Sequence, residues 1–164
     1  MTAIAPACFV LLLIGAANAA PLFAKKWFGS RLAWPLDGDV KWFDGEPVFG
    51  HSKTVRGIVF GIAAPSLMAW PLGHPMWQGA AIGATAMAGD LISSFCKRRM
   101  KMTPSSQAFG LDQGPEVVLP VLIARGWFGL SLLDAALVVV AFFCLEVVLS
   151  KVLFHFHLLR DRPY

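Results

Sequence analysis

Acidic and basic side chains gather between two apolar runs of the chain, in the stretch 89–116. Asp90 lies near the end of the first run, and Asp112 and Glu116 stand before the second. Four basic residues lie between these acids: Lys97, Arg98, Arg99 and Lys101. Because Mg²⁺ binds one or two carboxylates together with substrate phosphates, and Arg holds phosphate bidentately, this composition indicates a metal and phosphate site.

The position of Asp90 inside an apolar segment makes it a functional candidate. A carboxylate at membrane depth costs several kcal/mol unless it faces protein, water or a cation. At helical spacing, Asp90, Ser94 and Lys97 share one face. The alternative for Asp90 is an acid that snorkels at a helix end. Asp112 and Glu116 also have an alternative role, since the helix dipole alone favours acids at the start of a helix.

A second segment with phosphate-binding character is 44–57, which is rich in glycine and precedes an apolar run. Glycine allows a ligand to approach the backbone closely, and a helix N-terminus favours an anion. The residues at that helix start are Lys53, Thr54 and Arg56. They indicate a phosphate contact, and the equally weighted alternative is ordinary anchoring of a positive loop at the membrane.

The composition is that of an integral membrane protein. Hydrophobic residues make up 57% of the 164 residues, and the mean hydropathy is +0.63, whereas soluble domains are about 45–50% apolar. The three cysteines, Cys8, Cys96 and Cys144, lie far apart and have no partner at metal-ligand spacing. Neither a disulfide framework nor a zinc site is therefore indicated.

Because about 20 apolar residues cross a bilayer, the sequence predicts a single all-α membrane bundle of about five spans. The predicted spans are 3–23, 57–72, 75–95, 116–130 and 132–154, and the predicted cytoplasmic loops are 24–56 and 96–115. The fourth span is weak, since it contains Pro120 and is interrupted by Arg125. The first is taken as a span and not as a cleaved signal peptide, because Lys25 and Lys26 follow its apolar run.

Basic residues predict the orientation. Of the 14 Lys and Arg, six lie between the first two spans, four between the third and fourth, and three at or after the end of the last. Only Arg125 remains for the other side. Because positive loops stay cytoplasmic, we expect a multi-pass protein of the cell (inner) membrane, with the N-terminus outside and the C-terminus in the cytoplasm. Trp27, Trp34 and Trp42 of the first loop suit an aromatic belt at the headgroup level.

Small residues at four-residue spacing predict close helix packing. Gly57 and Gly61 lie in the second predicted span, and Gly79 and Gly83 in the third. This spacing lets helix backbones approach each other in a membrane. It says little about chemistry.

Common catalytic motifs of other classes are missing from the chain. It has no Walker A sequence, GxSxG elbow or HExxH motif. The acids and bases on the predicted cytoplasmic face therefore favour Mg²⁺-assisted phosphoryl or nucleotidyl transfer involving a membrane-resident substrate. The alternative is a non-enzymatic membrane transporter or assembly subunit whose basic loops only set its topology.

Three blocks of residues together form a specific pattern. They are Asp44-Gly45 with Phe49-Gly50 and Lys53-Thr54-Val55-Arg56-Gly57; Gly89-Asp90-Leu91-Ile92 with Ser94-Phe95 and Lys97-Arg98-Arg99; and Leu111-Asp112-Gln113. In these blocks, and in its layout of five spans and two loops, the chain resembles the CDP-archaeol synthase family, CTP-dependent enzymes related to bacterial CDP-diacylglycerol synthases. That family continues the third block with an apolar residue, Asp and Phe, whereas Gly114-Pro115-Glu116 follow here.

The resemblance implies a cytidylyltransferase. A lipid phosphate of the archaetidic or phosphatidic acid type would attack the α-phosphorus of CTP and release pyrophosphate. A phosphate monoester, with a second pKa of about 6, is mostly ionised at pH 7 and needs no protein base. The implied partners are CTP, the lipid phosphate and the bilayer, with no nucleic acid. The implied residues are Asp90, Asp112 and Lys97 for catalysis; Lys53, Thr54, Arg56, Ser94, Lys97, Arg98 and Arg99 for CTP and phosphate; and Asp90, Asp112 and Glu116 for Mg²⁺.

Overall fold

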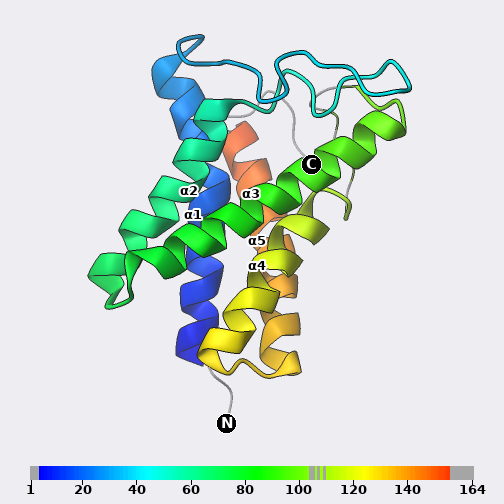
Figure 1. Ribbon diagram of the computed structural model, residues 1–164. Coiled ribbons are helices and arrows are strands. Elements are labelled where there is room, and N and C mark those ends of the chain that lie inside the picture. The colour runs from blue at the N-terminus through cyan, green and yellow to red at the C-terminus, as the bar shows by residue number, and fades with distance from the viewer. Residues whose placement is uncertain (1–3, 104–105, 107, 109, 156–164) are drawn as a thin grey trace.

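Five α-helices run alternately in opposite directions along the molecule (Figure 1). This computed structural model describes residues 4–103, 106, 108 and 110–155, of which 149–155 are described by their backbone alone. The helices are α1 (Ile4–Phe28), α2 (Val55–Ala69), α3 (Met76–Arg99), α4 (Gln113–Phe128) and α5 (Leu132–His155), and the 3-10 turn η1 (Trp70–Leu72) follows α2. The described residues form no β-strand, and two isolated β-bridges are their extended backbone pairings. The predicted all-α bundle is confirmed.

Three helices in the described part of the chain are long and apolar enough to cross a membrane: α1, α2 extended by η1, and α3. Together with the composition, they make this a membrane protein. Helix α4 has 16 residues, or about 24 Å at 1.5 Å per residue, which is less than the ~30 Å of a bilayer core. The number of crossings therefore stays a prediction.

Two helices extend beyond the predicted spans into basic sequence. Helix α1 continues through Lys25 and Lys26 to Phe28, and α3 continues to Arg99. Positive side chains interact favourably with the negative end of the helix dipole. The cluster Lys97, Arg98 and Arg99 is therefore the last turn of α3 and not part of the following loop.

Helices α2 and α3 pack with their backbones in contact. A Cβ atom on Gly83 would lie 2.6 Å from the carbonyl oxygen of Gly61, and one on Gly79 would overlap the Pro65 backbone. A Cβ on Gly61 would collide with the side chain of Met87. The predicted close approach is confirmed at these three glycines, because a side chain at any of them would push the two helices apart.

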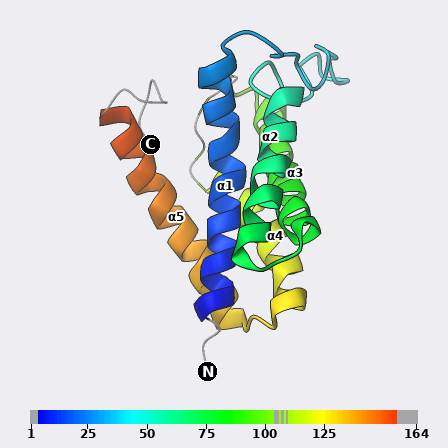
Figure 2. The same ribbon diagram turned by 90° about the vertical axis from the view of Figure 1, so that its left-hand side faces the viewer.

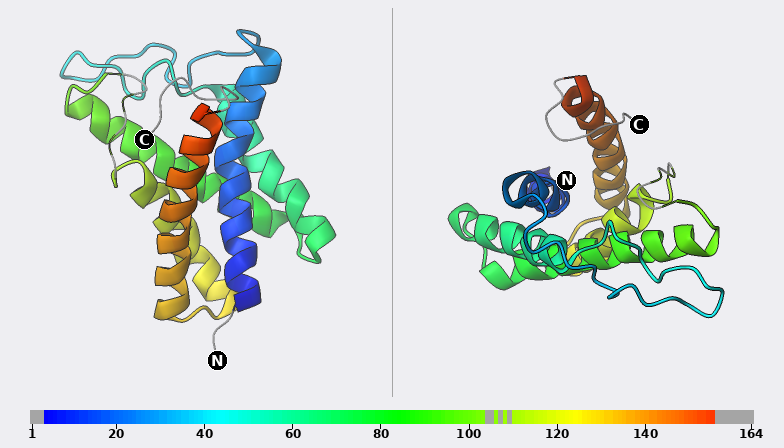
Figure 3. Two further views of the ribbon diagram at one scale, coloured as in Figure 1. Left: turned by 180° about the vertical axis from the view of Figure 1, so that it is seen from behind. Right: turned by 90° about the horizontal axis from the view of Figure 1, so that it is seen from above.

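The main hydrophobic core contains buried residues from all five helices. Its fully buried members include Leu13 and Ile14 of α1 and Val117 of α4, with Phe142 of α5 also buried. Helix α5 is inclined to α1 (Figure 2), and α3 crosses the bundle obliquely (Figure 1). The α1–α2 connection and the end of α3 lie at the end of the bundle away from the N-terminus (Figure 3). This arrangement brings the sequence-predicted residues to one end.

Candidate functional site

Backbone pairing in the first loop, 29–54, fixes the position of Lys53. The Leu36 amide donates to the Lys53 carbonyl at 2.8 Å, and the Val55 amide donates to the Trp34 carbonyl at 3.1 Å. The chain on both sides of Lys53 is thus held in an antiparallel pairing immediately before α2 begins. This pairing directs the lysine toward α3.

The carboxylate of Asp37 organises the middle of this loop. Its Oδ2 accepts hydrogen bonds from the amides of Phe49 (2.8 Å) and Gly50 (2.9 Å), and its Oδ1 accepts one from Asp39 (3.3 Å). Desolvation by burial raises the pKa of this carboxyl, but the hydrogen bonds from Gly50, Phe49 and Asp39 together outweigh it, so that the pKa lies below its ordinary value of 3.8. Sequence analysis missed this role, although an Asp-Gly pair is a turn pattern in which the Asp side chain binds nearby backbone.

We expect Asp37→Asn to loosen the loop, because one amide N–H₂ group would then face backbone donors. Hydrogen exchange at Phe49 and Gly50 should accelerate about tenfold, since a hydrogen bond to a charged group contributes about 1.5 kcal/mol. The lowered pKa means that this stabilisation is complete at neutral pH and is lost as the pH falls below about 4. Asp39→Asn is the control, because Asp39 pairs with His51 on the exposed surface. Equal acceleration at Phe49 and Gly50 in Asp39→Asn would contradict the role given to Asp37.

An ion pair joins the first loop to α3. Lys53 Nζ lies 2.6 Å from both carboxylate oxygens of Asp90, and the two side chains are 20% and 26% exposed. The Ser93 hydroxyl donates to the Asp90 carbonyl oxygen at 3.0 Å. The intramembrane acid thus has a cation as its partner, as its position requires, and that cation comes from the other block of the sequence.

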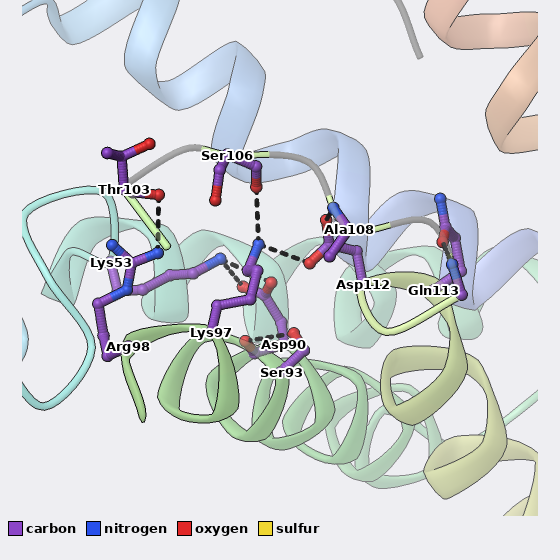
Figure 4. A network of polar contacts seen from close by, with 11 residues as sticks. Lys53, Asp90, Ser93, Lys97, Arg98, Thr103, Ser106, Ala108, Asp112 and Gln113 are labelled. Carbon is purple, nitrogen blue, oxygen red and sulfur yellow. Dashed lines mark hydrogen bonds and ion pairs between the residues drawn. The ribbon is translucent and has the colours of Figure 1, made fainter. Parts of the chain in front are cut away.

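A second ion pair joins α3 to the start of α4. Lys97 Nζ lies 2.5 Å from Asp112 Oδ1 and donates to the Ser106 carbonyl at 3.0 Å, and the other Asp112 oxygen accepts from the Ala108 amide at 2.9 Å. Arg98 donates to the Thr103 carbonyl at 2.9 Å. Figure 4 shows this pair beside the Lys53–Asp90 pair, above the last turns of α3. Two carboxylates and two lysines from three segments therefore meet.

Close packing of α3 and α4 brings Glu116 to the same place. A Cβ on Gly89 would lie 2.5 Å from the Glu116 amide nitrogen and would overlap the Pro115 carbonyl. Glu116 is buried in the first turn of α4. Gln113 is also fully buried, and its Oε1 accepts from the Gly110 amide at 2.7 Å. In the described part of the chain, its Nε2 has no hydrogen-bond partner.

The other predicted phosphate contacts are engaged within the protein. Arg56 donates to the carbonyls of Gly29 and Arg31, just after α1. The Thr54 hydroxyl caps α2 by accepting from the Gly57 amide. Arg99 contacts the first loop, with its Nη1 2.6 Å from Asp44. Ser94 is buried on α3. Of the predicted phosphate-binding residues, Lys53 and Lys97 therefore place ammonium groups beside the two carboxylates.

The donor set fits a magnesium ion that arrives with a phosphate ligand. Among the residues that the structure describes, no group of three His, Cys, Asp or Glu is arranged to hold a metal by itself. Mg²⁺ needs only one or two carboxylates when phosphate oxygens and water complete its octahedron. Asp90 and Asp112 supply such oxygens, each already beside a lysine.

Part of the chain is similar in sequence to known proteins. No family model matches the chain. The curated protein named CDP-archaeol synthase of Pyrobaculum aerophilum is 38% identical over 95 residues, which are 52% of this chain and 57% of that protein. The protein of the same name from Thermococcus onnurineus is 35% identical over 108 residues, covering 59% and 60%. The chain thus matches less than two thirds of the length of these relatives.

A solved structure gives a longer match. It is described as an intramembrane enzyme for archaeal membrane lipids biosynthesis, with a TM-score of 0.74 and 27% sequence identity over 87% of this chain and 91% of that one. The resemblance that the three sequence blocks predict is confirmed by these matches.

Proposed function

We propose that this chain, which resembles the CDP-archaeol synthases, transfers the cytidylyl group of CTP to a membrane lipid phosphate. An oxygen of the lipid phosphate attacks the α-phosphorus of CTP, the bond from that phosphorus to the β-phosphate bridge breaks, and pyrophosphate leaves. The product is a CDP-lipid joined by a new phosphoanhydride bond. The relatives carry the name of such a synthase, and the site chemistry of this chain supports the same reaction.

The observation that carries the proposal is the meeting of the Lys53–Asp90 and Lys97–Asp112 pairs at one end of the bundle. A triphosphate and a lipid phosphate together bring several negative charges to one place. Phosphoryl-group chemistry depends mainly on positioning and charge neutralisation. Ammonium groups and metal-binding carboxylates in contact provide both.

Asp90 and Asp112 would hold Mg²⁺, with Glu116 as a further candidate in the first turn of α4. When bound, the ion supplies positive charge to phosphate oxygens of the substrate and the leaving group. Lys53 and Lys97, released from their carboxylates, would turn to phosphate oxygens. Asp90 and Asp112 would then hold the ion, and Lys53 and Lys97 would neutralise phosphate charge.

A protein base is not needed for this reaction, because the lipid phosphate is mostly ionised at pH 7. The polar network in Figure 4 joins carboxylates to ammonium groups, with a guanidinium, hydroxyls and an amide around them. The residues of the site bind, orient and neutralise.

The orientation of the chain in the membrane is inferred from the side on which CTP is supplied. We propose that the site end of the bundle lies on the cytoplasmic side of the cell membrane, with the N-terminus outside. Most basic residues are at or near that end, in agreement with the positive-inside rule.

The purified protein in vesicles, given CTP, Mg²⁺ and ether or ester lipid phosphates, should release pyrophosphate with at least one lipid. Pyrophosphate is measured by a coupled colour assay, and the CDP-lipid by mass spectrometry. Chelation of Mg²⁺ should stop the release, because the two carboxylates would then hold no ion beside the phosphates. Absence of release with both lipid types would contradict the proposal and favour a non-enzymatic role.

A further inference from the structure

A short hairpin, residues 40–48, projects from the first loop. Its backbone is closed by hydrogen bonds from Val48 to Val40 (3.2 Å) and from Trp42 to Glu46 (2.8 Å). The turn is completed by Gly45, whose positive φ of 82° favours glycine. This segment, called hairpin 40–48 below, thus has a defined shape of its own.

Arg99 clamps hairpin 40–48 to the end of α3. Its guanidinium lies 2.6 Å from an Asp44 carboxylate oxygen and donates to the Pro47 carbonyl at 2.6 Å. The same group lies over the ring of Phe95, 4.9 Å from the centroid, and 5.9 Å from that of Trp42. Trp42 in turn packs edge-on against Phe95. Ionic, backbone and aromatic contacts therefore hold the hairpin in one orientation.

The clamped hairpin exposes apolar side chains. Phe43 is 98% exposed, Val40 60% and Trp42 44%. Clustered apolar exposure of this kind marks a protein or membrane contact. Phe43 contacts the ring of Trp42 but is otherwise almost fully exposed. Because Arg99 holds the hairpin in place, Phe43 is presented to something outside the chain.

The position of the hairpin points to the bilayer as its partner. Viewed along the bundle, hairpin 40–48 lies outside the area that the helices occupy, beside the end of α3 (Figure 3, right). Helix α3 is a candidate membrane span whose last residue is Arg99. Arg99 therefore both ends this candidate span and holds the hairpin. The hairpin thus lies at the end of the apolar part of the bundle.

We propose that hairpin 40–48 docks its exposed apolar side chains into the headgroup region of the surrounding lipid. Phe43, Val40 and Trp42 suit the interface, where aromatic side chains concentrate, and the exposed Lys41 between them suits anionic headgroups. Trp27, in the last turn of α1, and Trp34, in the first loop, are also exposed. Arg99 is then a positioning residue that holds the hairpin against the membrane.

Photocrosslinking in vesicles tests this contact. The full chain carrying benzoylphenylalanine in place of Phe43 is reconstituted into phosphatidylcholine–phosphatidylglycerol vesicles and irradiated, and adducts are identified by mass spectrometry. We expect lipid adducts at Phe43, and several-fold fewer with the same probe in place of His51, which is exposed in the same loop but polar. Equal yields at both positions, no lipid adduct at Phe43, or an adduct with protein or a second copy would overturn the proposal.

The positioning role of Arg99 is tested by the yield of the same lipid adduct. Arg99→Gln in the Phe43-probe protein should reduce the lipid adduct several-fold, and Arg99→Lys, which retains the charge toward Asp44, should restore part of it. An unchanged adduct yield in Arg99→Gln would overturn the role of Arg99. These measurements follow lipid contact and not turnover, so their outcome is independent of the cytidylyltransferase proposal.

Discussion

Asp90→Asn should lower turnover about 100-fold while the protein stays folded. The substitution removes a metal-binding carboxylate and leaves Lys53 without its partner. Loss of about 3 kcal/mol of charge stabilisation in the transition state corresponds to about 100-fold in rate. Because both side chains are a fifth to a quarter exposed, the unpaired lysine costs less than it would in a sealed core. The measurement is steady-state pyrophosphate release, with thermal unfolding as the check on folding.

Asp112→Asn is the corresponding test at the second ion pair. It removes the carboxylate that pairs with Lys97, and we expect a loss of the same order. Asp39→Asn, an acid of the first loop with an exposed histidine partner, should retain activity. Normal turnover in both Asp90→Asn and Asp112→Asn would refute the metal role of the two carboxylates.

Gly89→Ala should strongly destabilise the protein. The added Cβ would collide with the backbone of Pro115 and Glu116, and backbone cannot rotate aside as a flexible side chain does. Relief requires α4 to move away from α3. Overpacking of this kind costs up to about 3 kcal/mol. It would also displace Asp112 from Lys97, so that the loss of stability and the loss of activity should appear together.

Gly126→Ala is the matched control for this change. Gly126 also lies inside a helix, and a Cβ there meets no atom within 4 Å. Alanine is about 1 kcal/mol better than glycine in a helix interior, so Gly126→Ala should be neutral or slightly stabilising. Thermal unfolding in the same detergent compares the two variants. Equal melting temperatures would mean that α3 and α4 pack less closely than the Cβ overlap at Gly89 indicates.

The apolar runs were sufficient to predict the helices. Runs of about 20 apolar residues indicate spans regardless of their partners, and small residues such as Gly61 and Gly83 indicate close packing. The end of α3 was harder to place, because Lys97 and Arg99 read as loop residues by hydropathy but are favourable in a last helical turn.

Side-chain partners could not be read from spacing. The shared helical face of Asp90 and Lys97 suggested one local cluster, whereas each residue pairs with a residue from another segment. Arg99 carries the same charge as Lys97 but contacts the first loop. Which way a basic side chain points depends on the loops that pack around it, and a pattern along one helix contains no information about those loops.

The backbone contact between α2 and α3 has a consequence for biosynthesis. The two helices are neighbours in the chain and are joined by a short connection through η1, so little loop-closure entropy opposes their pairing. Lys53 immediately precedes α2 and Asp90 lies in α3, so their ion pair belongs to this helical hairpin. It can form before α4 has been synthesised. The Lys97–Asp112 pair needs the segment that precedes α4, so half of the site can assemble before the chain is complete.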